Sequence, residues 1–278
     1  MLTAAELKSV LAAYGLRLTK RRGQHYLVDA GVIERFLRLC PVGSRDTVVD
    51  IGAGLGALSE PLAARAGRVI AVDVDTGICA ALAQRLERLS NVRVVCQDIL
   101  TFSWDTVPEA VVVGAIPYQI TSPLLVSLTE HRAGIKEAWL LLQREVGQRM
   151  HAQPGTKAYG RLSILCQYGW EVSVAFHVPP SAFFPQPSVD SSWLRLIPRR
   201  QPAVTVPDEA AFFSLVKAGF GQRRKTLVNG LISGGLAKRP QAEAVVRRLN
   251  WPAGIRAEQL SLQQLAALAD ILYSRKPW

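Results

Sequence analysis

Ten consecutive residues set the architecture of this 278-residue chain: Thr47-Val48-Val49-Asp50-Ile51-Gly52-Ala53-Gly54-Leu55-Gly56. The first five, rich in β-branched side chains, predict a buried strand. The glycines that follow predict a tight turn at which the backbone approaches a ligand closely, and residues 57–66 predict a helix. Another apolar run, at residues 69–73, predicts the next strand. Together they form one βαβ unit, which is typical of a parallel sheet.

The same alternation continues to about residue 195. It predicts an α/β fold with a Rossmann-like, mostly parallel sheet that is covered by helices on both faces. We expect helices at residues 76–89, 123–128 and 144–150, strands at 92–95, 110–114, 138–142, 170–177 and 192–196, and an unassigned segment at 161–168.

A proline-rich, charged stretch at residues 198–202 marks a domain boundary. We therefore expect a first domain at residues 1–197 and a small helical domain at residues 198–278. Helical spacing with good N-terminal signals recurs four times in the second domain, at residues 208–218, 225–231, 241–249 and 261–273.

The net charge of +11 is concentrated at the C-terminal end of the chain. Residues 195–278 hold 14 Lys and Arg against 5 Asp and Glu, whereas residues 1–194 hold 19 against 17. Such a distribution favours a polyanion, above all nucleic acid, as the partner. A solvated basic face and an anionic membrane surface are the alternatives, although no basic amphipathic helix supports the latter. The candidate RNA-binding residues are Lys20, Arg21, Arg22, Arg223, Arg224 and Lys225.

Carboxylates follow the second and third predicted strands. Asp73 ends one strand and suits the two hydroxyls of a ribose, and Asp98, just beyond the next strand, suits an adenine amino group. With the glycine turn they indicate a cofactor that contains adenosine, either NAD or S-adenosylmethionine. The alternative is a structural glycine turn with exposed acids.

The fourth strand opens into Ala115-Ile116-Pro117-Tyr118, which resembles the N-[LI]-P-Y motif of enzymes that methylate adenine N6 in ribosomal RNA. Residues 23–27 resemble G-Q-N-F-L and residues 143–146 resemble Q-K-E-V. Four further blocks are also similar to the family, at residues 157–163, 178–183, 185–191 and 222–227. Over residues 20–230 the chain thus resembles the small-subunit rRNA adenine N6-dimethyltransferase family (KsgA-like).

This resemblance implies a class I methyltransferase fold and an enzyme that dimethylates two adjacent adenines of small-subunit rRNA in immature ribosomal particles. It implies S-adenosylmethionine as the cofactor, bound by His25, Leu27, Gly52, Gly54, Gly56, Asp73, Asp98 and position 115. It places the target base at Ala115, Pro117, Tyr118 and Phe183, with Tyr118 and Phe183 stacking on its two faces.

Two positions depart from the family motifs. His25 replaces Asn, a change that keeps hydrogen-bonding capacity, whereas Ala115 replaces the Asn whose side-chain carbonyl accepts hydrogen bonds from the adenine amino group. Loss of such a contact costs about a hundredfold in rate. Three explanations stay open: an inactivated variant, a lineage with altered chemistry, or compensation by another polar side chain. The alternative functions are an RNA-binding assembly factor with weak or no activity and, less favoured, a mitochondrial-type transcription factor.

The sequence also supports expectations about membrane segments, location, oligomeric state, metal sites and disulfides. The sequence has no apolar run long enough to span a membrane and no secretory signal, so we expect a cytoplasmic protein, and we expect a monomer. The spacing of Cys40, Cys79, Cys96 and Cys166 predicts neither a metal site nor a disulfide framework.

Overall fold

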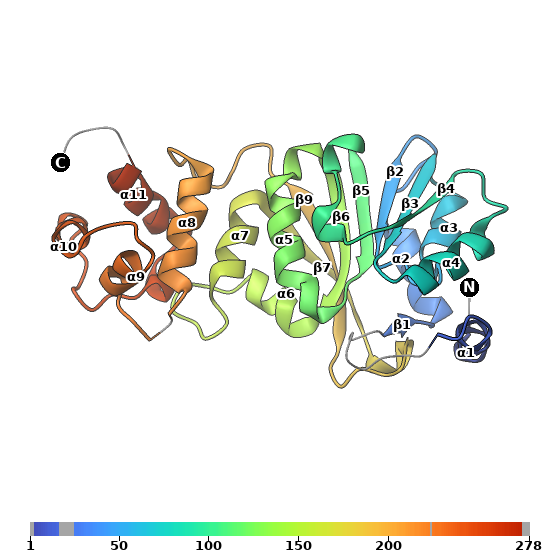
Figure 1. Cartoon of the computed structure of the whole chain (residues 1–278). Helices are drawn as coiled ribbons and strands as arrows, with labels where there is room; N and C mark the ends of the chain where they lie inside the picture. Colours follow the sequence, from blue (N-terminus) through green and yellow to red (C-terminus); the bar gives the residue numbers. More distant parts are fainter. Residues whose placement is uncertain (1–2, 17–24, 223, 274–278) are drawn as a thin grey trace. The chain divides into compact units, whose positions relative to one another are not determined.

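A mixed, mostly parallel sheet organises the chain (Figure 1). The structure is a computed structural model that describes residues 3–16, 25–222 and 224–273, and in these residues seven strands form the sheet in the order β4-β3-β2-β5-β6-β9-β7. The neighbouring strands from β4 to β6 are parallel, whereas β9 is antiparallel to β6. The strands are β2 Thr47–Ile51, β3 Arg68–Asp73, β4 Val92–Cys96, β5 Ala110–Ala115, β6 Ile135–Gln143, β7 Trp170–Val178 and β9 Ser191–Pro198.

The order of the strands reverses between β2 and β5, because the chain runs outward from β2 to β4 and then returns to the other side of β2. Ligands of open α/β sheets bind at the carboxyl ends of the strands at such a switch point. The glycine turn after Ile51 and the Ala115 end of β5 therefore lie where a ligand is expected.

Both faces of the central strands are covered. Val111 and Val113 of β5 pack in one core cluster with Phe36, while Ala110 and Val112, which point to the opposite face, are also fully buried. Burial on both faces explains why β5 is continuously apolar. The accompanying helices are α2 Ala30–Leu39, α3 Ser59–Ala63, α4 Thr76–Leu86, α5 Thr121–Glu130 and α6 Arg144–Met150.

A second, two-stranded sheet and an N-terminal helix complete this part of the chain. Strand β1 (Tyr26–Leu27) pairs antiparallel with β8 (Phe183–Phe184), which brings residues distant in sequence together. Helix α1 (Ala4–Ala13) begins at a Thr3 cap and buries Leu7 against Leu55 and Ile78. Neither α1 nor α2 is predicted from the sequence.

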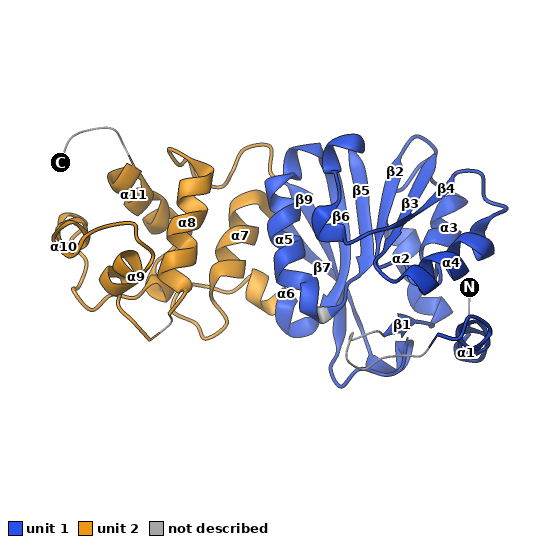
Figure 2. Cartoon of the chain, viewed as in Figure 1, with its two compact units in different colours: residues 1–147, 171–198 blue, residues 148–170, 199–278 orange. Residues whose placement is uncertain are grey.

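The chain divides into two compact units (Figure 2). Unit 1 comprises residues 1–147 and 171–198, and unit 2 comprises residues 148–170 and 199–278. The helices of unit 2 are α7 Arg161–Gly169, α8 Glu209–Phe220, α9 Leu227–Ser233, α10 Arg239–Arg248 and α11 Leu262–Tyr273. The α/β sheet and the C-terminal helical region confirm the predicted fold class.

Residues 148–170 differ from the predicted division, which assigned them to the first domain. Tyr168 of α7 lies 5.4 Å from the ring of Phe212, centroid to centroid, and the Tyr159 hydroxyl donates to the carbonyl of Leu260 at 2.9 Å. These buried side chains belong to the core of unit 2. Tertiary packing thus assigns the segment to the helical unit.

Within the described residues, no helix is long and apolar enough to cross a bilayer.

Candidate functional site

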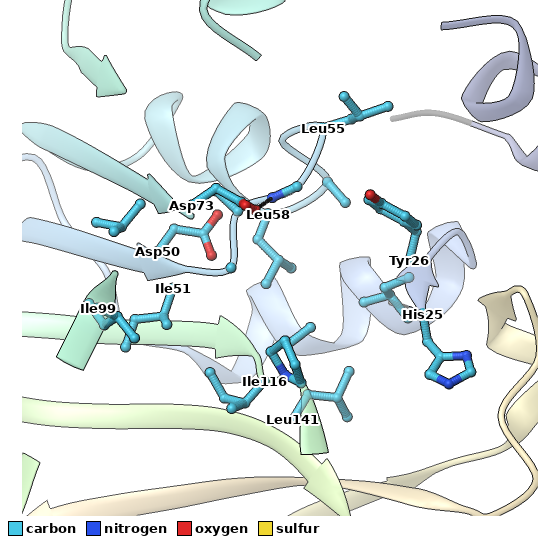
Figure 3. A pocket seen from close by; sticks show the side chains of 18 of the residues that line it. His25, Tyr26, Asp50, Ile51, Leu55, Leu58, Asp73, Ile99, Ile116 and Leu141 are labelled. Atoms are coloured by element: carbon cyan, nitrogen blue, oxygen red, sulfur yellow. Dashed lines mark hydrogen bonds between the residues drawn. The ribbon is translucent and has the colours of Figure 1, made fainter. Parts of the chain in front are cut away.

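A cavity of about 390 Å³ lies in unit 1 at the carboxyl ends of β2, β3 and β5 (Figure 3). In Figure 3 the carboxyl groups of Asp50 and Asp73 lie on one side of it, and His25 and Tyr26 lie on the other. The cavity brings together nine residues predicted from the sequence: His25, Leu27, Gly52, Gly54, Asp73, Asp98, Ala115, Pro117 and Phe183.

The turn after β2 contains glycines at positions where the backbone conformation or the available space favours glycine. Gly52 and Gly54 have φ angles of 65° and 55°, in the left-handed region that favours glycine. A Cβ at Gly54 would stand 3.0 Å from the Tyr26 ring, so glycine is also needed there for space. Gly56 does not line the cavity in the described structure. Gly56 has a φ angle of 85°, also in the left-handed region, and a Cβ there would meet the Leu82 side chain of α4 at 2.9 Å.

Asp73 is held in one orientation by the backbone. Its two carboxylate oxygens accept hydrogen bonds from the N–H groups of Gly54 and Asp75, each at 3.0 Å. Burial raises the pKa of the Asp73 carboxyl, although these two hydrogen bonds lower it. Each oxygen keeps a further lone pair, so the carboxylate can accept from two neighbouring hydroxyls of a ligand.

Asp98 stands at the rim of the same cavity. It is exposed, and its side chain caps the short helix η2 (Ile99–Thr101) by accepting from Leu100 N–H at 2.9 Å. Ile99 beside it is buried and lines the cavity, while Val74 is 65% exposed at the end of β3.

Asp50 is a cavity residue that begins the glycine motif but to which the sequence assigned no role in the site. It is 1% exposed and accepts a hydrogen bond of 2.6 Å from the Ser59 hydroxyl. Burial raises the pKa of Asp50 to about 7. The Ser59 hydrogen bond opposes this rise, and the negative charge of Asp73 contributes to it. A carboxyl that titrates near neutrality therefore lies beneath the glycine turn.

This raised pKa predicts a pH-dependent stability. Between about pH 4 and pH 7 the folded chain keeps a proton at Asp50 that the unfolded chain loses, so stability falls as pH rises through this window. Asp50→Asn should remove that dependence, which amounts to a few kcal/mol because one pKa unit corresponds to about 1.4 kcal/mol. Denaturant unfolding at pH 5 and pH 8 measures it. Equal pH dependence in both proteins would contradict the assignment.

The other end of the cavity is mainly apolar. Ala115, Leu141 and Phe183 come from β5, β6 and β8, respectively, and Leu27 completes this wall. The Ala115 side chain is partly buried and offers no polar atom. Pro117 lines the cavity, whereas Tyr118 lies in the short helix η4 (Tyr118–Ile120) with a side chain outside the described structure. His25 Nδ1 lies 2.7 Å from the carbonyl oxygen of Pro185, which fixes the ring beside this wall.

The predicted RNA-binding residues are only partly described. Lys20, Arg21, Arg22 and Arg223 lie outside the described residues. Arg224 and Lys225 are exposed in unit 2, just before α9. Among the described residues, no group of three His, Cys, Asp or Glu side chains is placed to hold a metal ion.

Several lining residues were not predicted as site residues: Tyr26, Asp50, Gln97, Gln119 and Ser191. Tyr26 and Ser191 lie in blocks of sequence that resemble the family, and Gln97 and Gln119 adjoin predicted residues. Asp50 lies in the stretch that contains the glycine turn, so position in or beside a motif was the available signal for all five.

Known proteins are similar to this chain over most of its length. A model of the family "Ribosomal RNA adenine dimethylase" matches residues 15–271. The chain is 43% identical over 274 residues to ribosomal RNA small subunit methyltransferase A of Moorella thermoacetica, and the match covers 93% of each protein.

Two solved structures are similar over most of the chain. A dimethyladenosine transferase from Plasmodium falciparum has a TM-score of 0.74 at 26% identity, covering 88% of this chain and 96% of that one. The 23S rRNA methyltransferase ErmE has a TM-score of 0.60 at 28% identity, covering 88% and 99%. With the family model matching nearly the whole chain, this protein belongs to the ribosomal RNA adenine dimethylase family.

Proposed function

We propose that the chain transfers methyl groups from S-adenosylmethionine to N6 of two adjacent adenines in small-subunit rRNA. The observation that carries this proposal is the layout of the cavity in unit 1, with the Asp73 carboxylate, which the backbone orients, at one end and an apolar wall at the other. Family membership supports the substrate class.

The residues present fit the cofactor. The Asp73 carboxylate, already oriented by two backbone N–H groups, would hold the ribose hydroxyls, and Asp98 with Ile99 would hold the adenine. Gly52 and Gly54 have no side chains, so the rest of the cofactor could pass close to the backbone at these residues. When bound, S-adenosylmethionine supplies an electrophilic methyl group on a sulfonium.

The apolar wall would hold the adenine base that accepts the methyl group. Leu27, Leu141 and Phe183 exclude water and hold a flipped base flat, so that its amino group meets the reacting carbon in line. By resemblance, Tyr118 stacks on the other face of the base. Orientation and exclusion of water are the main contributions of the protein to such a displacement.

Analysis of nucleosides tests the proposal directly. Unmethylated small-subunit particles incubated with this protein and labelled cofactor should yield N6,N6-dimethyladenosine in digests of the RNA, as measured by mass spectrometry. Labelling of large-subunit RNA instead would reject the substrate. Binding of particles and cofactor without methylation would leave the assembly-factor alternative.

We further propose that the basic residues of unit 2 grip RNA through phosphates. Neutralising Arg223, Arg224 and Lys225 should weaken binding to immature particles and reduce the slope of log affinity against log salt, by about 0.7 to 0.9 per lost contact. Titration of particle binding over a range of salt concentrations measures this slope.

The matched control changes two exposed arginines of unit 1, Arg38→Gln and Arg68→Gln, which lie on α2 and at the amino end of β3. These changes remove two positive charges from unit 1, one fewer than the triplet, and should alter the slope less for each charge removed. Equal effects per charge in both sets would show that the triplet acts only through net charge.

The same proposal makes immature small-subunit particles the partner and the cytoplasm the location, because such particles are assembled there. As part of the same proposal, the enzyme works as a monomer.

A further inference from the structure

The apolar end of the cavity contains one polar side chain whose role is unassigned. The lining residues on strands β5, β6, β8 and β9 are Ala115, Leu141, Phe183 and Ser191, and among these described residues only Ser191 has a polar side chain. Ser191 is 2% exposed.

The strand pairing places Ser191 on the same face of the sheet as the base wall. Ala115 of β5 pairs with Leu141 of β6, and Ser191 of β9 pairs with Gln143, two residues further along β6. Trp193, two residues beyond Ser191, stacks on Phe36 with ring centroids 4.2 Å apart. Because alternate residues of a strand share a face, Ser191 points to the side on which Ala115, Leu141 and Phe183 lie.

The neighbouring serine shows the contrast. Ser192 is also 2% exposed, but it faces the opposite side of the sheet, where its Oγ lies 2.8 Å from Nδ1 of His177. The Ser191 hydroxyl, in contrast, has no hydrogen-bond partner within the described residues. Its oxygen is not among the fully enclosed polar atoms of the described residues that lack a partner, so it is open to the cavity and can accept a hydrogen bond from a ligand there.

Two other polar side chains, those of His25 and Gln119, line the cavity without lying on these four strands. His25 is engaged through Nδ1 with the Pro185 carbonyl, and Gln119 is exposed on η4. Ser191 is the one that combines burial, an unpaired hydroxyl within the described residues and a position on the base wall.

We propose that the Ser191 hydroxyl accepts a hydrogen bond from the exocyclic amino group of the target adenine and orients it, in a chain whose residue 115 has no side-chain acceptor. A hydroxyl oxygen has two lone pairs and can accept from an amine while it donates elsewhere. The identity of the substrate in this inference rests on the proposed function.

The first test measures nucleoside binding and does not need catalysis. With S-adenosylhomocysteine saturating the cofactor end, adenosine and purine riboside, which lacks the amino group, are titrated and followed by NMR. Wild type should bind adenosine about tenfold more tightly, as expected for one hydrogen bond to a buried group. Ser191→Ala should lose this preference, Ser191→Thr should keep it, and Ser192→Ala, the matched control, should behave as wild type.

The second test measures methylation of small-subunit particles. Ser191→Ala should lower kcat/KM about tenfold with cofactor affinity unchanged, and it should cost less in an Ala115→Asn background, where a second acceptor is present. If wild type methylates no particles, the proposed function fails, while the nucleoside titration still decides the role of Ser191.

Three results would overturn the inference: equal binding of the two nucleosides by wild type, unchanged adenosine preference in Ser191→Ala, or loss of that preference in Gln119→Ala instead. The wild-type comparison holds even if the Ser191→Ala protein does not fold.

Discussion

Ala115→Asn is expected to raise the rate of adenine methylation in small-subunit particles by about ten- to a thousandfold, since each factor of ten corresponds to about 1.4 kcal/mol of barrier. The new side-chain carbonyl would accept from the adenine amino group and direct its lone pair at the methyl group. Ala115 is partly buried and lines an open cavity, so the larger side chain does not enter a closed core.

The gain should appear in kcat, while the affinities for cofactor and RNA change little, because the contact is used mainly in the transition state. Single-turnover labelling of particles, together with calorimetry for the cofactor, separates these quantities. Ala115→Leu is the control, because it adds volume without an acceptor and should not raise the rate.

Equal rates for wild type and Ala115→Asn would mean that another group already directs the amine, and Ser191 is then the first candidate. Inactivity of both proteins, with RNA and cofactor still bound, would favour the assembly factor over the enzyme.

Local sequence was sufficient for the part of the fold in which burial and turn chemistry act within a few residues. The run Thr47–Ile51 and the glycines after it formed the expected strand and turn, and β5 formed from the predicted apolar run. Because parallel strands end at one edge, the strand pattern alone predicts that the carboxylates of Asp73 and Asp98 lie near each other, and both line the cavity.

Elsewhere the outcome depended on contacts between distant residues. Helix α2 carries a strong apolar face, yet its role appears only when Phe36 meets Trp193, more than 150 positions away. Residues 148–170 contain an ordinary apolar helix, and only its packing on Phe212 assigns it to unit 2.

In the candidate site, too, local sequence predicted some features, whereas others depend on tertiary contacts. A glycine pattern does not reveal which glycine lines the cavity: Gly52 and Gly54 do, whereas Gly56 packs against Leu82. The pKa of Asp50 is raised by complete burial, a tertiary property. Ser191 reaches the base wall through the antiparallel pairing of β9 with β6, which no local pattern specifies.

The largest loss of cofactor binding is expected from Asp73→Ala. The carboxylate would make two hydrogen bonds to the ribose, and each such bond to a charged group contributes about 1.5 to 3 kcal/mol, so the loss should be at least about a hundredfold. Calorimetric titration with S-adenosylmethionine measures it. Circular dichroism checks that the variant folds, because removal of the carboxylate leaves the N–H groups of Gly54 and Asp75 without their acceptors.

Asp98→Ala is the matched control for this position, because Asp98 is also a cavity carboxylate at a strand end. Asp98 is exposed, and the one described hydrogen bond that its carboxylate accepts comes from the N–H of Leu100, so water competes for its contact with the ligand. Its loss should weaken binding by about tenfold, as for one exposed hydrogen bond. Undiminished binding by Asp73→Ala, or tighter binding of NAD than of S-adenosylmethionine by wild type, would contradict the assignment of Asp73. Because the two carboxylates differ in burial and in backbone support, a larger effect at Asp73 would trace cofactor affinity to the glycine turn that orients it.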